Sequence, residues 1–130
     1  MMFSFNYIEV QAGSIRAGVE MVLESHKSVD TILMGCRRTD PGMASSSYNS
    51  KSDNGYPRFT RIFPLLDWNN SMIWSFIFEN SLKFPTLYHS GYSSIGTKSN
   101  TKINPKLITG DTILPAWELT SDESDRFGRS

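Results

Sequence analysis

The first hydrophobic positions of the chain alternate and then change to a helical spacing. Residues 5–10, FNYIEV, place aromatic and aliphatic side chains on opposite sides, which predicts a strand. In the following segment, SIRAGVEMVLESHK, apolar residues recur every three or four positions with glutamates opposite, which predicts an amphipathic helix. We expect Ser14 to cap this helix and the helix to end near Lys27.

A second apolar run, residues 31–34 (TILM), shows no alternation, which is typical of a buried parallel strand. Strand, helix and strand within about 30 residues predict a right-handed βαβ unit. The segment GCRRTDP, residues 35–41, then leaves the carboxyl end of a parallel strand. Because ligands bind at that edge of open α/β sheets, this position favours a binding function for the segment.

The remaining pattern predicts one α/β domain over residues 1–130. Residues 42–58 are rich in Ser, Asn, Gly and Asp and are predicted to form a long polar loop, followed by a third strand within 59–66. Asp67 or Asn69 is expected to cap a second helix that runs to about residue 80. Turns, a short extended piece from residue 115 and a charged tail follow.

Charge and cysteine content narrow the class of protein. The chain has 13 basic and 13 acidic residues, so its net charge favours neither nucleic acids nor membranes as partners. Its one cysteine, Cys36, permits no internal disulfide, which is typical of an intracellular protein. The first ten residues lack the features of a secretory signal, so we expect a cytoplasmic location and leave a mitochondrial one open.

Candidate chemistry gathers in GCRRTDP. A guanidinium group forks onto phosphate oxygens, so Arg37 and Arg38 indicate either an anion site or a solvated loop. Asp40, held before a proline, could accept hydrogen bonds from the N–H groups of a ligand, or could form an Asx turn with Arg37. Gly35 allows a turn or a close approach of the backbone.

Further candidates lie in and after the third strand. Trp68 could stack on a ligand ring or fill the core, whereas Trp74 is assigned to the core. Arg61 could contact phosphate or pair with Asp67. His26 and His89 are predicted to be structural or on the surface, and no residues have the spacing of zinc ligands.

Three segments together carry a resemblance to one family. They are ILMGCRRTDP (32–41); RFTRIFPLLDWNNSMIWSFI (58–77) with LYHSGYSSIG (87–96) and NPKL (104–107); and PAWELTSDESDRFGR (115–129). In this order and spacing, and above all in the GxRxTDP pattern, the chain resembles the eukaryotic-type FAD synthases, which are FMN adenylyltransferases of the phosphoadenosine-phosphosulfate reductase-like fold. The resemblance runs from about Ile8 to Arg129.

The resemblance implies a nucleotidyltransferase that moves AMP from ATP to FMN and yields FAD and pyrophosphate, with Mg²⁺. It also implies a mostly parallel sheet with helices on both faces. By the same resemblance, the flavin is bound by Gly35, Asp40 and Trp68, the nucleotide phosphates are bound by Arg37 and Arg61, and the catalytic residues are Arg126 and Arg129 of DRFGR. Catalysis in such a transfer is mostly positioning and charge neutralisation.

One feature of the family is missing from the chain. Its members begin with a strand and a phosphate-binding loop of the type SxNGGKD, and the nearest segment here, SFNY at residues 4–7, has no glycine, lysine or aspartate. We therefore expect the chain to correspond to the C-terminal part of the family domain, with the Mg²⁺ ligands elsewhere. It is a shortened chain, or needs the other half in trans, or has lost ATP chemistry.

Two functions follow as alternatives. One is FAD synthesis, with little or no activity from this chain alone, and the other is a non-catalytic flavin-nucleotide-binding fragment or subunit. Sulfate-reducing relatives of the same fold fit less well, because they use a C-terminal cysteine motif that is absent here. A sheet without its first strand leaves an open edge, so we also expect self-association through that edge.

Overall fold

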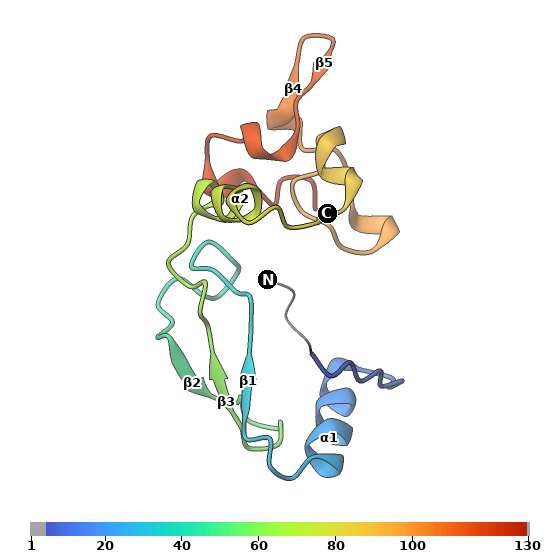
Figure 1. Cartoon of the computed structure of the whole chain (residues 1–130), viewed down its shortest axis with the longest axis vertical. Coiled ribbons are helices and arrows are strands. Elements are labelled where there is room, and N and C mark those ends of the chain that lie inside the picture. Colours follow the sequence, from blue (N-terminus) through green and yellow to red (C-terminus); the bar gives the residue numbers. More distant parts are fainter. Residues whose placement is uncertain (1–4, 130) are drawn as a thin grey trace. The chain divides into compact units, whose positions relative to one another are not determined.

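The computed structural model describes residues 5–129, which form two compact units (Figure 1). Unit 1 comprises the chain up to Cys36 together with Ser45–Leu66, and unit 2 comprises Arg37–Ala44 together with the chain from Asp67 onward. The segment Arg37–Ala44, which directly follows the strand containing Ile32, therefore belongs to unit 2. No helix among residues 5–129 has the length and apolar character needed to cross a membrane.

Unit 1 contains a three-stranded sheet with the order β1-β3-β2. Strand β1 (Thr31–Leu33) runs parallel to β3 (Thr60–Ile62), and β2 (Asn49–Lys51) runs antiparallel to β3. The α/β class is confirmed. The sequence predicted that residues 31–34 pair in parallel with residues 5–10, and β1 instead runs parallel to β3. Strand β2 lies in the segment expected to be a loop, because its polar sequence NSK carries none of the apolar alternation by which a strand is recognised.

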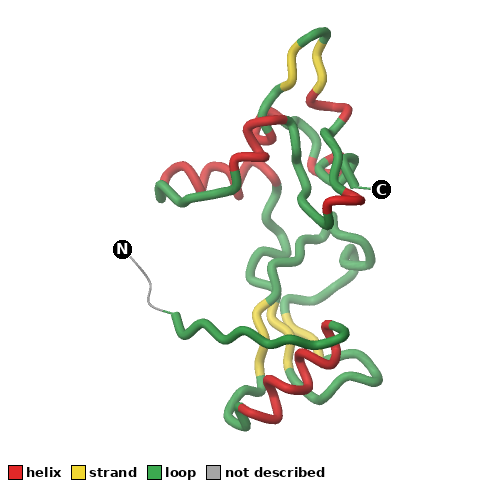
Figure 2. The backbone as a smooth tube through the Cα atoms, turned by 90° about the vertical axis from the view of Figure 1, so that its right-hand side faces the viewer, coloured by secondary structure: helices red, strands yellow, loops and turns green. Residues whose placement is uncertain are grey.

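Helix α1 (Ile15–Ser25) begins where the sequence predicts, since the Ser14 side chain accepts a hydrogen bond from the Ala17 amide. It ends two residues before the expected Lys27. Figure 2 shows α1 crossing beside the strands. A cavity of about 140 Å³ is lined from the helix by Ile15 and Val19 and from the strands by Ile32 and other residues. No residue of α1 is fully buried, so its apolar face is only partly covered within unit 1.

The predicted strand at residues 5–10 is wrong, and so the βαβ unit lacks its first strand. Residues 5–12 have no regular structure, and the side chains of Phe5 and Tyr7 lie 83% and 85% exposed. An isolated strand satisfies its backbone groups only by pairing, and no strand among residues 5–129 pairs with this segment. The polar Asn6 and Glu9 also weaken the apolar pattern that would hold it on a sheet.

Unit 2 is organised around the aromatic ring of Trp74 on helix α2 (Asn70–Glu79). The Asn69 side chain caps this helix by accepting a hydrogen bond from the Met72 amide at 2.8 Å, as expected for one of two candidate caps. Trp74 is 7% exposed, which confirms its assignment to the core. Its ring packs within 6 Å of four others, from Phe78, Phe84, Tyr88 and Trp117, at centroid distances of 5.8, 5.2, 5.3 and 5.5 Å.

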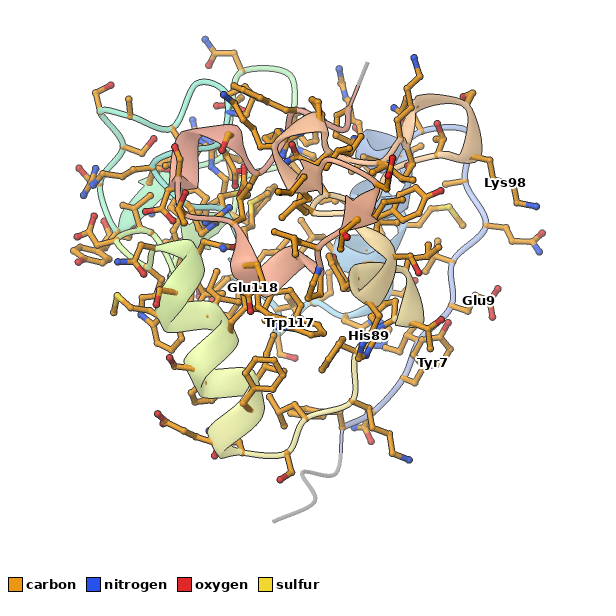
Figure 3. All side chains as sticks on the ribbon, turned by 90° about the horizontal axis from the view of Figure 1, so that it is seen from above. Tyr7, Glu9, His89, Lys98, Trp117 and Glu118 are labelled. Atoms are coloured by element: carbon orange, nitrogen blue, oxygen red, sulfur yellow. The ribbon has the colours of Figure 1, made fainter. Side chains whose placement is uncertain are left out.

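His89 extends this aromatic cluster. Its ring stacks on Phe84 with a centroid distance of 5.3 Å and meets the edge of Trp117 at 4.9 Å. Figure 3 shows His89 and Trp117 side by side. The imidazole is thus a packing group here, and the whole cluster ties α2 to the two short 3-10 turns Thr86–Ser90 and Ala116–Glu118.

The rest of unit 2 consists of short turns and one hairpin. Strands β4 (Ile108–Thr109) and β5 (Thr112–Ile113) pair antiparallel around Gly110, whose φ of 58° a glycine adopts without strain. The sequence prediction of an extended piece from residue 115 is wrong, because Pro115 is extended but opens the 3-10 turn Ala116–Glu118.

The predicted charged tail is also packed instead of solvated. Residues Asp122–Ser124 form another 3-10 turn, and Ser124 and Asp125 are only 4% and 6% exposed. Polar side chains are buried where hydrogen bonds and ion pairs satisfy them, and local composition does not reveal such long-range partners.

Candidate functional site

The segment GCRRTDP makes a tight turn as it enters unit 2. The Arg37 amide donates to Asp40 Oδ2 at 2.9 Å, and the Asp40 amide donates to the Arg37 carbonyl at 3.0 Å. This is the Asx turn that the sequence predicted as the alternative to a ligand contact for Asp40. It occupies one carboxylate oxygen and aims the second, Oδ1, at another part of unit 2.

Arg126 from the C-terminal segment reaches that second oxygen. Its Nη1 lies 3.3 Å from Asp40 Oδ1, with side chains 39% and 21% exposed. Asp40 therefore stands between the backbone of Arg37 and the guanidinium of Arg126. Two residues that are 86 positions apart in the chain, both assigned to the site from sequence, meet here.

Arg37 forms the most buried ion pair of the site, with Asp125. Their side chains are only 11% and 8% exposed. Among the described residues, Nη1 of Arg37 is buried and has no hydrogen-bond partner. A buried donor left unpaired costs about 1–3 kcal/mol, and more for a charged group. The guanidinium thus keeps one unused donor next to the Asp40 turn.

Arg38 and Asp67 form a second, more exposed ion pair, with side chains 39% and 45% exposed. Arg38 Nη1 also donates to the carbonyl of Ala44 at 3.3 Å, which closes the loop. Asp67 directly precedes Trp68, whose ring packs edge-on against Phe76 at 5.5 Å. Trp68 is half-buried and lines a shallow groove of about 360 Å³ along α2.

Arg129 anchors the end of the described chain. Its Nη1 donates to the Ile95 carbonyl at 2.9 Å and lies 3.4 Å from Ser94 Oγ. A Cβ on Gly96 would come within 2.5 Å of the Arg129 guanidinium carbon, so the arginine lies directly over that glycine. Its partners are neutral oxygens of the SSIG turn, which leaves its positive charge uncompensated by them.

Two of the predicted site residues belong to unit 1. Arg61 uses all three guanidinium nitrogens there, on Ser50 Oγ, the Lys51 carbonyl and, with two bonds of 2.8 and 3.0 Å, Asp53. The suggested pairing of Arg61 with Asp67 is therefore wrong. Gly35 has open space around its Cα, and nothing would contact a Cβ there within 4 Å.

The sequence did not identify Asp125 as part of the site. Its only local signal is its place directly before Arg126 in a charged segment. The acidic residues of the site, Asp40, Asp67 and Asp125, each pair with an arginine. Among the side chains that the structure describes, no group of three or more His, Cys, Asp or Glu could hold a metal ion.

The fold and the site thus define an α/β protein with a cluster of arginines suited to an anionic ligand. Residues 17–103 match the family described as phosphoadenosine phosphosulfate reductase domain, and the chain belongs to this family.

Within the family, the chain is similar to proteins named FAD synthases. It is 39% identical over 109 residues to a probable FAD synthase of Schizosaccharomyces pombe, covering 83% of this chain and 41% of the relative. It is 33% identical over 107 residues to the flavin adenine dinucleotide synthase of Saccharomyces cerevisiae, covering 82% of this chain and 35% of that protein. The chain therefore spans less than half the length of these relatives.

Solved structures agree on the fold. The chain superimposes on Candida glabrata FMN adenylyltransferase in complex with FAD and inorganic pyrophosphate with a TM-score of 0.84 at 24% identity, over 92% of this chain and 55% of that one. The complex of the same enzyme with FMN and the ATP analogue AMPCPP gives the same score over 57% of its chain. The resemblance to eukaryotic FAD synthases stated from the sequence is confirmed.

Proposed function

We propose that this chain supplies the flavin-nucleotide half of an FAD synthase, in which AMP passes from ATP to FMN to give FAD and pyrophosphate. The observation that carries the proposal is the buried Arg37 with its unused donor, beside the pair formed by Asp40 and Arg126. Relatives of the chain are named FAD synthases, and a solved neighbour is described with FMN and an ATP analogue.

The site residues act in this proposal by binding and by neutralising charge. Arg37 contacts a phosphate with the donor that the protein leaves free, once the atoms that cover it move aside. Asp40 accepts hydrogen bonds from the flavin ring, and Arg126 and Arg129 balance the charge that accumulates as a phosphate oxygen of FMN attacks the α-phosphorus of ATP and pyrophosphate leaves. No covalent intermediate with the protein is needed.

The proposal also assigns roles to Trp68, Gly35 and Arg61. Trp68 stacks on the flavin with the ring face that Phe76 leaves uncovered. Gly35 gives the ligand room beside the backbone. Arg61 is the weakest assignment, because Asp53 already compensates its charge. We expect its loss to affect the fold of unit 1 more than nucleotide binding.

The alternative is binding without catalysis. The glycine-rich SxNGGKD pattern, whose backbone amides would hold the ATP phosphates, does not occur in the sequence. We therefore infer that this chain alone binds FMN and FAD in the cytoplasm and depends on a second polypeptide segment for ATP.

Sulfate-reducing relatives support this assignment less. The phosphoadenosine 5'-phosphosulfate reductase of Buchnera aphidicola (strain Tuc7) is 36% identical but matches only 58% of the chain, whereas the FAD synthases match 82% or more.

Isothermal titration of the purified chain with FMN, FAD and ATP tests the proposal. We expect heat from FMN and FAD, none from ATP, and FMN binding weakened at least tenfold by Arg37→Gln. The matched control is Arg38→Gln, which removes a neighbouring but more exposed arginine and should change the affinity much less. Tight ATP binding with no response to FMN would refute the proposal.

A further inference from the structure

A buried amide lies behind the arginine site. Asn104 is 0% exposed, and both polar atoms of its side chain are used. Its Oδ1 accepts a hydrogen bond from the Lys106 amide at 2.9 Å. Its Nδ2 donates to the Ser124 carbonyl and to Ser93 Oγ, both at 2.7 Å. One side chain therefore connects the NPKL and GYSSIG segments with Ser124, directly before DRFGR.

Ser93 extends this connection by one residue. Its hydroxyl accepts from Asn104 and donates to the carbonyl of Asp125. Asn104 and Ser93 thus bond the two successive carbonyls of Ser124 and Asp125. The carboxylate of Asp125 in turn forms the buried ion pair with Arg37. A continuous chain of hydrogen bonds and one ion pair leads from Asn104 to the Arg37 guanidinium.

The backbone around this chain of contacts is tightly interlocked. A Cβ on Gly128 would lie 2.3 Å from the Lys102 carbonyl oxygen, and a Cβ on Gly91 would lie 2.4 Å from Ile113 Cγ2. Close-packed segments of this kind do not deform gradually, so a group held on them keeps one position. Fixed orientation matters most for Arg37, because a guanidinium binds phosphate only when its planar fork faces the oxygens.

We propose that Asn104 and Ser93 are positioning residues for Arg37. They contact no ligand, but they fix the main chain of Asp125, and Asp125 fixes the plane of the Arg37 guanidinium so that its unused donor faces one direction. This inference rests on the proposed function for its effect on FMN affinity. Its structural part, the fixed guanidinium, is testable without any ligand.

The primary variant is Ser93→Ala, and its matched control is Ser124→Ala. Ser124 Oγ also donates to a backbone carbonyl, that of Ser121, at 2.9 Å, but does not hold the Asp125 carbonyl. Both variants remove one hydroxyl from the same network and should lower the thermal midpoint similarly. Asn104→Asp is less informative, because a carboxylate facing the Ser124 carbonyl would disturb folding itself.

The first measurement is the affinity for FMN by isothermal titration. We expect Ser93→Ala to weaken binding about three- to tenfold, the range of one lost hydrogen bond between neutral groups. Ser124→Ala should change the affinity less than twofold, and Ser93→Thr should restore it. In an Arg37→Gln background Ser93→Ala should have no further effect, because its influence passes through Arg37. An equal effect in both backgrounds overturns the inference.

The second measurement follows the Arg37 side-chain N–H signals by ¹⁵N NMR in the ligand-free chain, assigned by their loss in Arg37→Gln. We expect a single set of slowly exchanging signals in the unmodified chain and in Ser124→Ala, and broadened or fast-exchanging signals in Ser93→Ala. Unchanged signals in Ser93→Ala overturn the inference. Failure of the unmodified chain to bind FMN, with the NMR result as expected, refutes the proposed function and leaves the positioning role supported.

Discussion

The buried pair of Arg37 and Asp125 provides the sharpest prediction about stability. In Asp125→Asn the shape of the side chain is kept but its charge is lost, so a guanidinium that is 11% exposed remains without a counter-charge. Breaking a buried ion pair from one side costs about 3–5 kcal/mol. Since small domains are stable by about 5–15 kcal/mol, this loss should remove a large share of the stability of unit 2.

The matched control is Asp67→Asn, which breaks the pair with Arg38. That pair is 39% and 45% exposed, and exposed pairs contribute about 0–1 kcal/mol. A second control, Arg37→Met with Asp125→Leu, removes both charges together and should recover most of the loss, because neither partner is then left buried and unpaired. The three variants separate the burial of charge from the loss of a contact.

Urea unfolding followed by tryptophan fluorescence is the suitable assay. All three tryptophans, Trp68, Trp74 and Trp117, lie in unit 2, so the signal reports on that unit. We expect the urea midpoint to fall strongly for Asp125→Asn and little for Asp67→Asn, with unchanged slopes. If the two single variants lose the same free energy of unfolding within about 1 kcal/mol, the argument from burial is refuted.

Three further predictions concern local structure and association. Gly91 has a φ of 80° and no room for a Cβ, so Gly91→Ala should destabilise unit 2 by several kcal/mol. Gly35 lies in open space, so Gly35→Ala should leave the thermal midpoint within about 2 °C. Equal thermal midpoints for the two variants would contradict this prediction. Asn69→Ala should cost about 1 kcal/mol through loss of the α2 cap, read from the urea midpoint, and Asn69→Asp should restore it. Among residues 5–129, strand β1 pairs on one side only, and Leu33 is 69% exposed, so we expect self-association that Leu33→Lys reduces in sedimentation equilibrium. A chain that is monomeric at all concentrations would contradict this prediction.

Local signals in the sequence were enough to locate both long helices. Through a side-chain oxygen, Ser14 and Asn69 each accept a hydrogen bond from a backbone amide of the first helical turn, and that amide lies within three residues of the cap. Apolar spacing likewise located β1 and β3. The failures occurred where a structure depends on a distant partner: residues 5–10 have no strand to pair with, and β2 is recognised only by its pairing with β3.

The candidate site shows the same difference between local sequence signals and contacts with distant partners. The GxRxTDP and RxGR patterns were sufficient to nominate Arg37, Asp40, Arg126 and Arg129 and the family. What each arginine contacts was not readable from the patterns, because a guanidinium next to several carboxylates in sequence has many possible partners. Arg61 of β3, the other proposed phosphate ligand, forms an ion pair with Asp53 within unit 1.

The sequence by itself thus determined the two helices, the positions of β1 and β3, the core assignment of Trp74 and membership in the family, since these depend on periodicity, capping and motif spacing. Only the tertiary structure decided that the charged C-terminal segment is buried and that its Asp125 holds Arg37. That contact joins two residues that are far apart in the chain, and its free energy depends on burial, which has no local signature in sequence.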